Sequence, residues 1–206
     1  MIIEQPSWIY RILFPKAVWR IDPHEKCVYL TFDDGPHPEI TPWVLDLLDK
    51  YQIKATFFCV GDNVNKYPET YRMILERGHN TGNHTFHHSQ GIWSFTKRYV
   101  ADVVLAEQYI QSKLFRPPHG HMRINQFFSL RKRYRVIMWD VVTRDYSWRM
   151  TPEKVYHVVK KYTRKGSIIV FHDSLKAKER MMEALPKSIE WMMEQGYIFK
   201  TIDGNF

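Results

Sequence analysis

Short apolar runs alternate along this chain with longer stretches in which apolar residues recur at helical spacing. Each run is continuous or nearly continuous in apolar residues, which is typical of strands buried on both faces of a sheet. The predicted strands are the segments 26–32, 54–60, 79–83, 114–118, 135–141, 166–173 and 196–202. The pattern therefore predicts about seven strands, each buried on both faces of the sheet.

The stretches between these runs have the period of amphipathic helices. The predicted helices are 39–50, 65–77, 96–113, 123–133, 151–164 and 176–195. Thr151 followed by Pro152 is typical of a helix start, because threonine caps the first turn and proline fits the first helical position. Strands that alternate with helices predict a parallel α/β sheet. The spacing leaves open whether this sheet closes as a barrel or is doubly wound.

Residues 1–25 precede this alternation and are predicted to form an N-terminal extension packed on a single domain of residues 26–206. Trp8, Ile9, Ile12 and Leu13 have helical spacing, and we expect them to fill the bottom of the core. The alternative is a contact with a membrane interface. The extension lacks the features of a signal peptide, and no run of about eighteen apolar residues occurs, so a cytoplasmic protein without a membrane-inserted segment is expected.

The composition fits one domain with a full core, because the chain has 206 residues of which 44% are hydrophobic. Cys27 and Cys59 lie in apolar runs and are expected to be small buried residues, not a disulfide. The formal net charge of +8 includes basic clusters beside predicted helices, which are typical of solvated faces. Neither an RNA-binding signature nor a zinc-finger spacing accompanies this charge, so we expect no nucleic-acid partner. The sequence leaves the oligomeric state open, with a monomer favoured.

Polar side chains that can carry chemistry follow several of the predicted strands. In either architecture the loops after the carboxyl ends of parallel strands converge on one face. The residues at these ends are Asp33, Asp34, His84, Arg116, Asp140, Asp145 and His172. We therefore expect all of them to meet at one rim of the sheet; for Asp140 a structural role, bonding to loop backbone, is an equal alternative.

Two short patterns among these residues suggest a catalytic metal. Asp33 and Asp34 are adjacent in TFDDGP, and His84 and His88 form an H-x-x-x-H pair. A carboxylate with two imidazoles is a ligand set that leaves positions open for water or substrate. If one aspartate binds the ion, its neighbour stays free to take a proton from water. Each pattern alone is unspecific, since Asp-Gly-Pro also forms turns, but together they predict a metal-dependent hydrolytic site.

The motifs TFDDGP, HTFHH, RPPHG, DVVTRDY and IIVFHD occur in this order between residues 31 and 173. Through them the chain resembles the NodB-homology polysaccharide deacetylases, which form carbohydrate esterase family 4. The resemblance covers most of the chain, and five motifs in register are highly specific. It implies a distorted (β/α) barrel of about seven parallel strands and metal-dependent hydrolysis of acetyl groups on sugars.

The resemblance also implies which residues bind the metal and which takes the proton. Asp33 corresponds to the general base of the family. Asp34, His84 and His88 correspond to the ligands of one divalent metal ion. Zinc is the expected ion, with cobalt, nickel or manganese as alternatives.

Three further charged residues have counterparts in the family. Arg116 resembles the arginine that orients the base, and a guanidinium there stabilises the ionised carboxylate and fixes its rotamer. His172 corresponds to the general acid. Asp145 would hydrogen-bond to His172, keep its imidazolium available and set its tautomer.

The expected contacts to the oxyanion and the substrate are Pro117, His119, Tyr146, Trp148 and Val170. His119 replaces the usual tyrosine of the family, but the contact comes from the backbone N–H, so the chemistry is expected to survive. Tyr146 stands where the family has tryptophan, with Trp148 two residues later, and Val170 replaces a more common leucine. These changes touch the pocket for the acetyl methyl group and leave the substrate preference open.

Three functions are compatible with these residues. The first is a deacetylase of an N-acetylated glycan such as peptidoglycan or a chitin-like oligomer. The second is an esterase that removes O-acetyl groups from xylan or another sugar, which would use the same residues. The third is a glycan-binding protein that kept the fold and lost catalysis. The intact set of Asp33, Arg116, Asp145 and His172 argues against the third.

Overall fold

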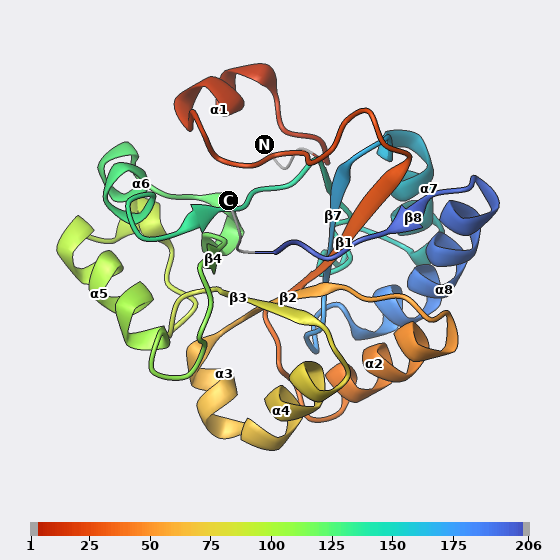
Figure 1. The fold of residues 1–206 in the computed structure, drawn as a ribbon, viewed down its shortest axis with the longest axis horizontal. Coiled ribbons are helices and arrows are strands. Elements are labelled where there is room, and N and C mark those ends of the chain that lie inside the picture. Colours follow the sequence, from red (N-terminus) through yellow and green to blue (C-terminus); the bar gives the residue numbers. More distant parts are fainter. Residues whose placement is uncertain (1–3, 204–206) are drawn as a thin grey trace.

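The structure, a computed structural model, describes residues 4–203. Within this range eight parallel strands form one curled sheet, which helices surround on the outside (Figure 1). The strands are β1 (Cys27–Asp33), β2 (Thr56–Cys59), β3 (Asn80–Asn83), β4 (Leu114–Phe115), β5 (Arg135–Val136), β6 (Val141–Val142), β7 (Ser167–His172) and β8 (Ile198–Phe199).

The helices follow the strands in alternation, as the sequence predicts. The α-helices are α1 (Trp8–Leu13), α2 (Ile40–Lys50), α3 (Gly61–Lys66), α4 (Pro68–Glu76), α5 (Thr96–Ala106), α6 (Ile124–Leu130), α7 (Pro152–Tyr162) and α8 (Lys178–Glu194). Two short 3₁₀ helices, η1 (Gly91–Trp93) and η2 (Pro118–Gly120), lie in loops after β3 and β4.

The sheet curls because one stretch of chain belongs to both of its edges. In the strand order β5-β4-β3-β2-β1-β7-β6, the outermost strands β5 and β6 are consecutive in sequence, and residues 137–140 connect them. The N–H of Ile137 donates to the carbonyl of Phe115 at one edge, and that of Asp140 donates to Ile168 at the other. The distorted (β/α) barrel is thereby confirmed, and the doubly wound alternative is excluded.

Two predicted elements are divided in the structure. The predicted strand 135–141 consists of β5 and β6, because the chain crosses between the two sheet edges in its middle. The predicted helix 65–77 covers the end of α3 and all of α4. Pro68 begins α4, and since proline has no backbone N–H to donate, it cannot continue the preceding helix.

The alternation of side chains along β1 determines what lies inside the barrel. Successive residues of a strand point to opposite faces of the sheet. The outward-facing side chains Val28, Leu30 and Phe32 pack into the main hydrophobic core with residues of α2, α7 and α8. Cys27 and Tyr29 belong to a smaller cluster made by the inner faces of the strands. Thr31 and Asp33 continue this inner face, so two polar side chains stand above an apolar floor.

The N-terminal segment covers the seam between β5 and β6. The carbonyl of Glu4 accepts from the N–H of Val142 in β6. Further along, Val18 forms a parallel bridge with Ile137, beside β5. A segment outside the alternating pattern therefore pairs with both edges of the open sheet.

The side chains that anchor this segment differ from the expected ones. Phe14 and Trp19 are buried in a cluster with residues of α5 and α6. The four residues expected to fill the core, Trp8, Ile9, Ile12 and Leu13, are exposed. That expectation is wrong, because the side of α1 that faces the barrel carries Tyr10, Arg11 and Phe14.

The structure also bears on the two cysteines and on membrane-spanning helices. Cys27 and Cys59 are both buried and free, as expected. Among residues 4–203, no helix has the length and apolar character needed to cross a membrane.

Replacing Thr151 by alanine should destabilise the protein by about 1 kcal/mol, the usual contribution of a helix N-cap. The Thr151 hydroxyl accepts a hydrogen bond from the N–H of Lys154 at the start of α7, as the sequence predicts. Urea unfolding of Thr151→Ala and Thr151→Ser measures this contribution, since serine retains the cap. Equal midpoints for the wild type and the alanine variant would contradict it.

Candidate active site

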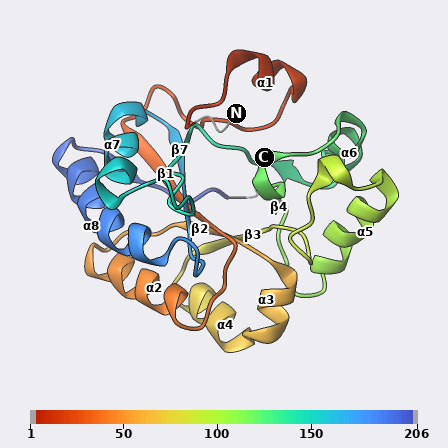
Figure 2. The same ribbon diagram turned by 180° about the vertical axis from the view of Figure 1, so that it is seen from behind.

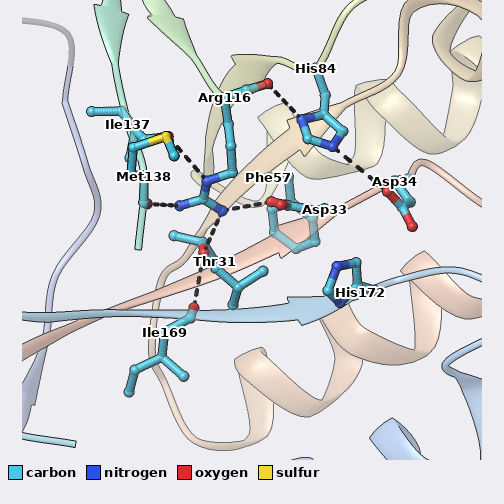
Figure 3. Close-up of polar contacts among 12 residues, drawn as sticks. Thr31, Asp33, Asp34, Phe57, His84, Arg116, Ile137, Met138, Ile169 and His172 are labelled. Atoms are coloured by element: carbon cyan, nitrogen blue, oxygen red, sulfur yellow. Dashed lines mark hydrogen bonds and ion pairs between the residues drawn. The ribbon is translucent and has the colours of Figure 1, made fainter. Parts of the chain in front are cut away.

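The adjacent side chains of Asp33 and Asp34 point in different directions (Figure 3). Asp33 ends β1 and its Oδ1 lies 2.6 Å from Nη1 of Arg116. Asp34 has a left-handed backbone, with φ of 80°, and its Oδ1 lies 3.0 Å from Nε2 of His88 and 3.7 Å from Nε2 of His84. The turn after the strand therefore separates two neighbouring carboxylates into two environments.

Arg116 is fully buried at the end of β4, and all of its polar contacts are made by protein groups that the sequence separates widely. Besides Asp33, Nη1 donates to Oγ1 of Thr31 at 2.8 Å, and Nη2 donates to the carbonyl of Met138 at 3.0 Å (Figure 3). The guanidinium lies 4.0 Å from the ring centroid of Phe58. These contacts hold the guanidinium in one orientation and satisfy a buried charge.

His84 is oriented by the backbone of the same arginine. Its Nδ1 lies 2.8 Å from the Arg116 carbonyl oxygen, which can only accept, so Nδ1 carries the hydrogen and Nε2 presents a lone pair toward Asp34. Burial lowers the pKa of His84 to about 4, so the imidazole is neutral near pH 7. A neutral imidazole is the form that binds a metal ion.

The ligand atoms of Asp34, His84 and His88 all lie within 4.8 Å of one another. Burial raises the pKa of Asp34, but the hydrogen bond to His88 and the charges of nearby histidines outweigh this effect and hold the pKa well below its usual range. The site thus offers one carboxylate and two imidazole nitrogens that converge on one point. This donor set fits a divalent ion such as zinc.

His172 ends β7 on the other side of Asp34 (Figure 3). Asp145 holds its backbone and its ring. The Asp145 carboxylate accepts the His172 backbone N–H at 2.8 Å and Nδ1–H of its ring at 2.7 Å. Burial alone would lower the pKa of His172, but the charge and hydrogen bond of Asp145 raise it to about 9. His172 is therefore an imidazolium at neutral pH, with Nε2 as its remaining donor.

The proposed substrate contacts lie around these charged groups. Pro117 is buried after Arg116, and the ring of His119 lies 4.8 Å from that of His88. The ring of Tyr146 packs edge-on against His172, with centroids 4.7 Å apart. Val170 precedes His172 by two residues on β7 and is buried, whereas Trp148 is 80% exposed in the loop between β6 and α7.

Asp140 does not belong to this rim, although its position after a predicted strand suggested it. Its buried carboxylate accepts from Arg11, from Arg164 and from Ser167 at the start of β7. His172 stands at the opposite end of that strand. The expectation is wrong because residues 137–140 cross the seam and bring Asp140 to the amino-terminal end of β7.

Asp173 is a buried site residue that the sequence patterns do not single out. Its carboxylate accepts the Gly35 N–H at 3.1 Å and the Thr41 hydroxyl, and its own N–H donates to the carbonyl of Asp33. A Cβ on Gly35 would lie 2.0 Å from Oδ2 of Asp173, so only glycine fits between the two. Asp173 thereby fixes the turn that separates Asp33 from Asp34.

Left-handed backbone conformations concentrate around the site. Five residues other than glycine have positive φ there: Asp34, Thr85, His88, His119 and Arg144. Such conformations are unfavourable for most side chains and persist where the surrounding contacts enforce them. The Thr85 N–H, for example, is held by Oδ1 of Asn83 at 2.8 Å.

His87 lies between the candidate ligands His84 and His88 in the sequence. Its side chain turns aside and bonds to Asp102, because adjacent residues diverge in direction.

With this geometry established, the chain can be compared with known proteins. The sequence model of a family described as polysaccharide deacetylase matches residues 20–133, which is more than half of the chain. A peptidoglycan-N-acetylglucosamine deacetylase of Bacillus cereus is 31% identical over 90% of this chain and 91% of its own length. This chain belongs to the polysaccharide deacetylase family.

Solved structures of the same family have the same fold. A crystal structure of a peptidoglycan N-acetylglucosamine deacetylase, bound to a naphthalenyl N-hydroxybenzamide, superimposes with a TM-score of 0.88 at 27% identity, covering 95% of both chains. A carbohydrate esterase family 4 pseudoenzyme from Bacillus anthracis has a TM-score of 0.79 at 26% identity, covering 91% of this chain and 68% of its own. The family therefore includes at least one member described as a pseudoenzyme, so the catalytic groups of each chain must be considered individually.

Replacing Asp173 by asparagine should destabilise the protein by about 1 to 3 kcal/mol, because the amide cannot accept hydrogen bonds from both Gly35 and Thr41 as the carboxylate does. Thr41→Val removes one of the two bonds and should have a smaller effect. Urea unfolding of both variants measures the losses. Wild-type stability of Asp173→Asn would show that the turn is held by other contacts.

Proposed function

We propose that this protein is a metal-dependent hydrolase that removes acetyl groups from an N-acetylated glycan. The observation that carries the proposal is the separation of the two adjacent carboxylates: Asp34 faces two imidazoles, while Asp33 is held by a buried arginine. A single carboxylate would suffice for binding an ion. The second, oriented beside it by a buried arginine, is what a hydrolytic reaction requires of a general base.

Asp33 would take a proton from the water that attacks the acetyl carbonyl carbon. Its ion pair with Arg116 engages one carboxylate oxygen and leaves the other to accept the proton. Because Arg116 also bonds to Thr31 and Met138, the base cannot rotate away from the reacting water. This arrangement supplies the orientation that a general base needs.

His172 would donate its proton to the leaving nitrogen of the sugar as the carbon–nitrogen bond breaks. The products are then acetate and a free amine on the glycan. Asp145 keeps the imidazolium available and directs Nε2 toward the site, since Nδ1 is already bonded. The negative charge that develops on the carbonyl oxygen would be stabilised by the backbone N–H of His119.

Asp34, His84 and His88 would hold the divalent ion, with zinc as the best fit to this donor set. A bound ion of this kind polarises the acetyl carbonyl and lowers the pKa of water. The His84 hydrogen bond to the Arg116 carbonyl orients its ring for this role, so the ligand and the base depend on the same arginine.

The substrate class is supported by the relatives, whose named substrates are peptidoglycan sugars. We expect Tyr146, which packs against His172, and the buried Val170 to contact the acetyl methyl group, with the exposed Trp148 available to the glycan. We therefore expect N-acetylglucosamine-containing glycans to be substrates, with the preferred length and linkage set by these side chains.

Replacing Asp33 by asparagine should lower kcat by at least about 100-fold, because general-base catalysis contributes a factor of this size or more. Metal affinity should change little, since Asp33 is not among the converging ligand atoms. Asp34→Asn is the matched variant and should lose affinity for the metal as well as activity. Equilibrium zinc titration and acetate release measure the two properties separately. Retained turnover in Asp33→Asn would remove Asp33 as the base.

The alkaline limb of the pH profile should report the deprotonation of His172. The pKa of His172 is raised above its ordinary value to about 9, so the protonated acid is present at neutral pH and is lost as the pH rises through about 9. Asp145→Asn removes the charge that raises this pKa and should move the alkaline limb of kcat to lower pH. Tyr146→Phe, which keeps the ring contact, should not move it. An unchanged limb in Asp145→Asn would exclude His172 as the acid.

A further inference from the structure

Helix α1 turns its large apolar side chains away from the protein. Trp8 is 71% exposed, Ile9 55%, Ile12 64% and Leu13 44%, and we call these four residues the α1 patch. Both views show α1 at the edge of the molecule, outside the ring of helices around the barrel (Figure 1, Figure 2). Contiguous exposed apolar side chains of this size usually mark a contact with another surface.

The outward orientation of the patch is fixed by contacts on the opposite side of α1. The Tyr10 hydroxyl bonds to the carbonyl of Gly120, and Nη2 of Arg11 lies 2.8 Å from the buried carboxylate of Asp140. The ring of Phe14 packs against that of Phe127 on α6, with centroids 5.4 Å apart. The helix cannot turn the patch inward without breaking these contacts, so the exposure is built into the fold.

The surroundings of the α1 patch are basic. Lys16 follows α1, and Arg131 and Lys132 follow α6; Arg131 lies over the ring of Phe127, against which Phe14 packs. Among residues 4–203, none of these three cations forms an ion pair with a carboxylate.

Three acidic residues that belong to the N-terminal segment, bond to it or follow α5 have basic partners. Glu4 pairs with Arg144, and Glu107 pairs with Arg133. Asp140 is buried between Arg11 and Arg164. The patch therefore combines exposed tryptophan and aliphatic side chains with cations that no neighbouring carboxylate neutralises.

We propose that the α1 patch binds the surface of an anionic phospholipid bilayer. Tryptophan and aliphatic side chains enter the boundary between headgroups and acyl chains, and neighbouring basic residues are attracted to anionic headgroups. A second copy of the chain fits less well, because a two-fold contact would bring the same unpaired cations together. The proposed contact is a peripheral one, in which the α1 patch enters the headgroup boundary and the barrel stays in the aqueous phase.

The test is co-sedimentation of the full chain with phosphatidylcholine vesicles that contain phosphatidylglycerol, and with vesicles of phosphatidylcholine alone. Ile12→Ser should lower the partition coefficient for anionic vesicles about tenfold, since burial of one large apolar side chain contributes about this factor. Ile198→Ser is the matched control, because Ile198 is 65% exposed on β8, outside α1, and should leave binding within about twofold. Lys132→Glu should weaken binding to the anionic vesicles only.

Failure of the wild type to bind the anionic vesicles would overturn the proposal. Equal loss in Ile12→Ser and Ile198→Ser would also overturn it, because binding would then not depend on the α1 patch. Sedimentation velocity without lipid tests the competing occupant. A wild-type dimer that Ile12→Ser converts to monomer would assign the patch to a second copy. These readouts measure binding alone, so they are independent of whether the proposed reaction occurs.

Discussion

The site depends on the ion pair between Arg116 and Asp33. Removing two charges from water is costly, and a buried pair is favourable only when further hydrogen bonds satisfy the remaining groups. Here the guanidinium also bonds to Thr31 and to Met138, whose carbonyl lies in the segment that joins the two sheet edges. The arginine that orients Asp33, the proposed base, therefore also bonds to the segment that closes the barrel.

Arg116 also contacts the proposed metal ligands, through its backbone carbonyl. The Arg116 carbonyl fixes the ring of His84, while its side chain fixes Asp33 (Figure 3). Asp34 follows Asp33 and has a left-handed backbone, which directs its carboxylate to His84 and His88. Asp173, directly after β7, secures this turn by accepting the N–H of Gly35. Two carboxylates of identical chemistry thus have different surroundings, which would let one site combine the proposed ligand and the proposed base.

Much of this arrangement could be predicted from the sequence, because it follows from periodicity and motif order. Continuous apolar runs predicted the parallel strands, and the alternation along β1 places Thr31 and Asp33 on one face. The division of the predicted strand 135–141 was not predictable, because apolar residues continue through the point where the chain leaves one edge for the other.

Tertiary contacts explain the remaining differences between the predicted and the observed structure. Helical spacing identified the apolar side of α1 but not its direction, which is set by the buried partners of Tyr10 and Arg11. Asp140 lies near the end of a predicted strand, as Asp33 and His172 do. Residues 137–140, however, cross between the two sheet edges and bring it to the opposite end of the barrel. No spacing rule indicated Asp173, whose role comes from a turn 138 residues away along the chain.

The most direct test of the account is acetate release by the zinc-loaded protein from peptidoglycan fragments and N-acetylglucosamine oligomers, with acetylated xylan for comparison and chelated protein as control. The account predicts acetate and free amine in equal amounts from an N-acetylated glycan, and loss of both on chelation. Zinc bound at Asp34, His84 and His88 without acetate from any of these glycans would contradict it. The preserved site would then serve glycan binding alone.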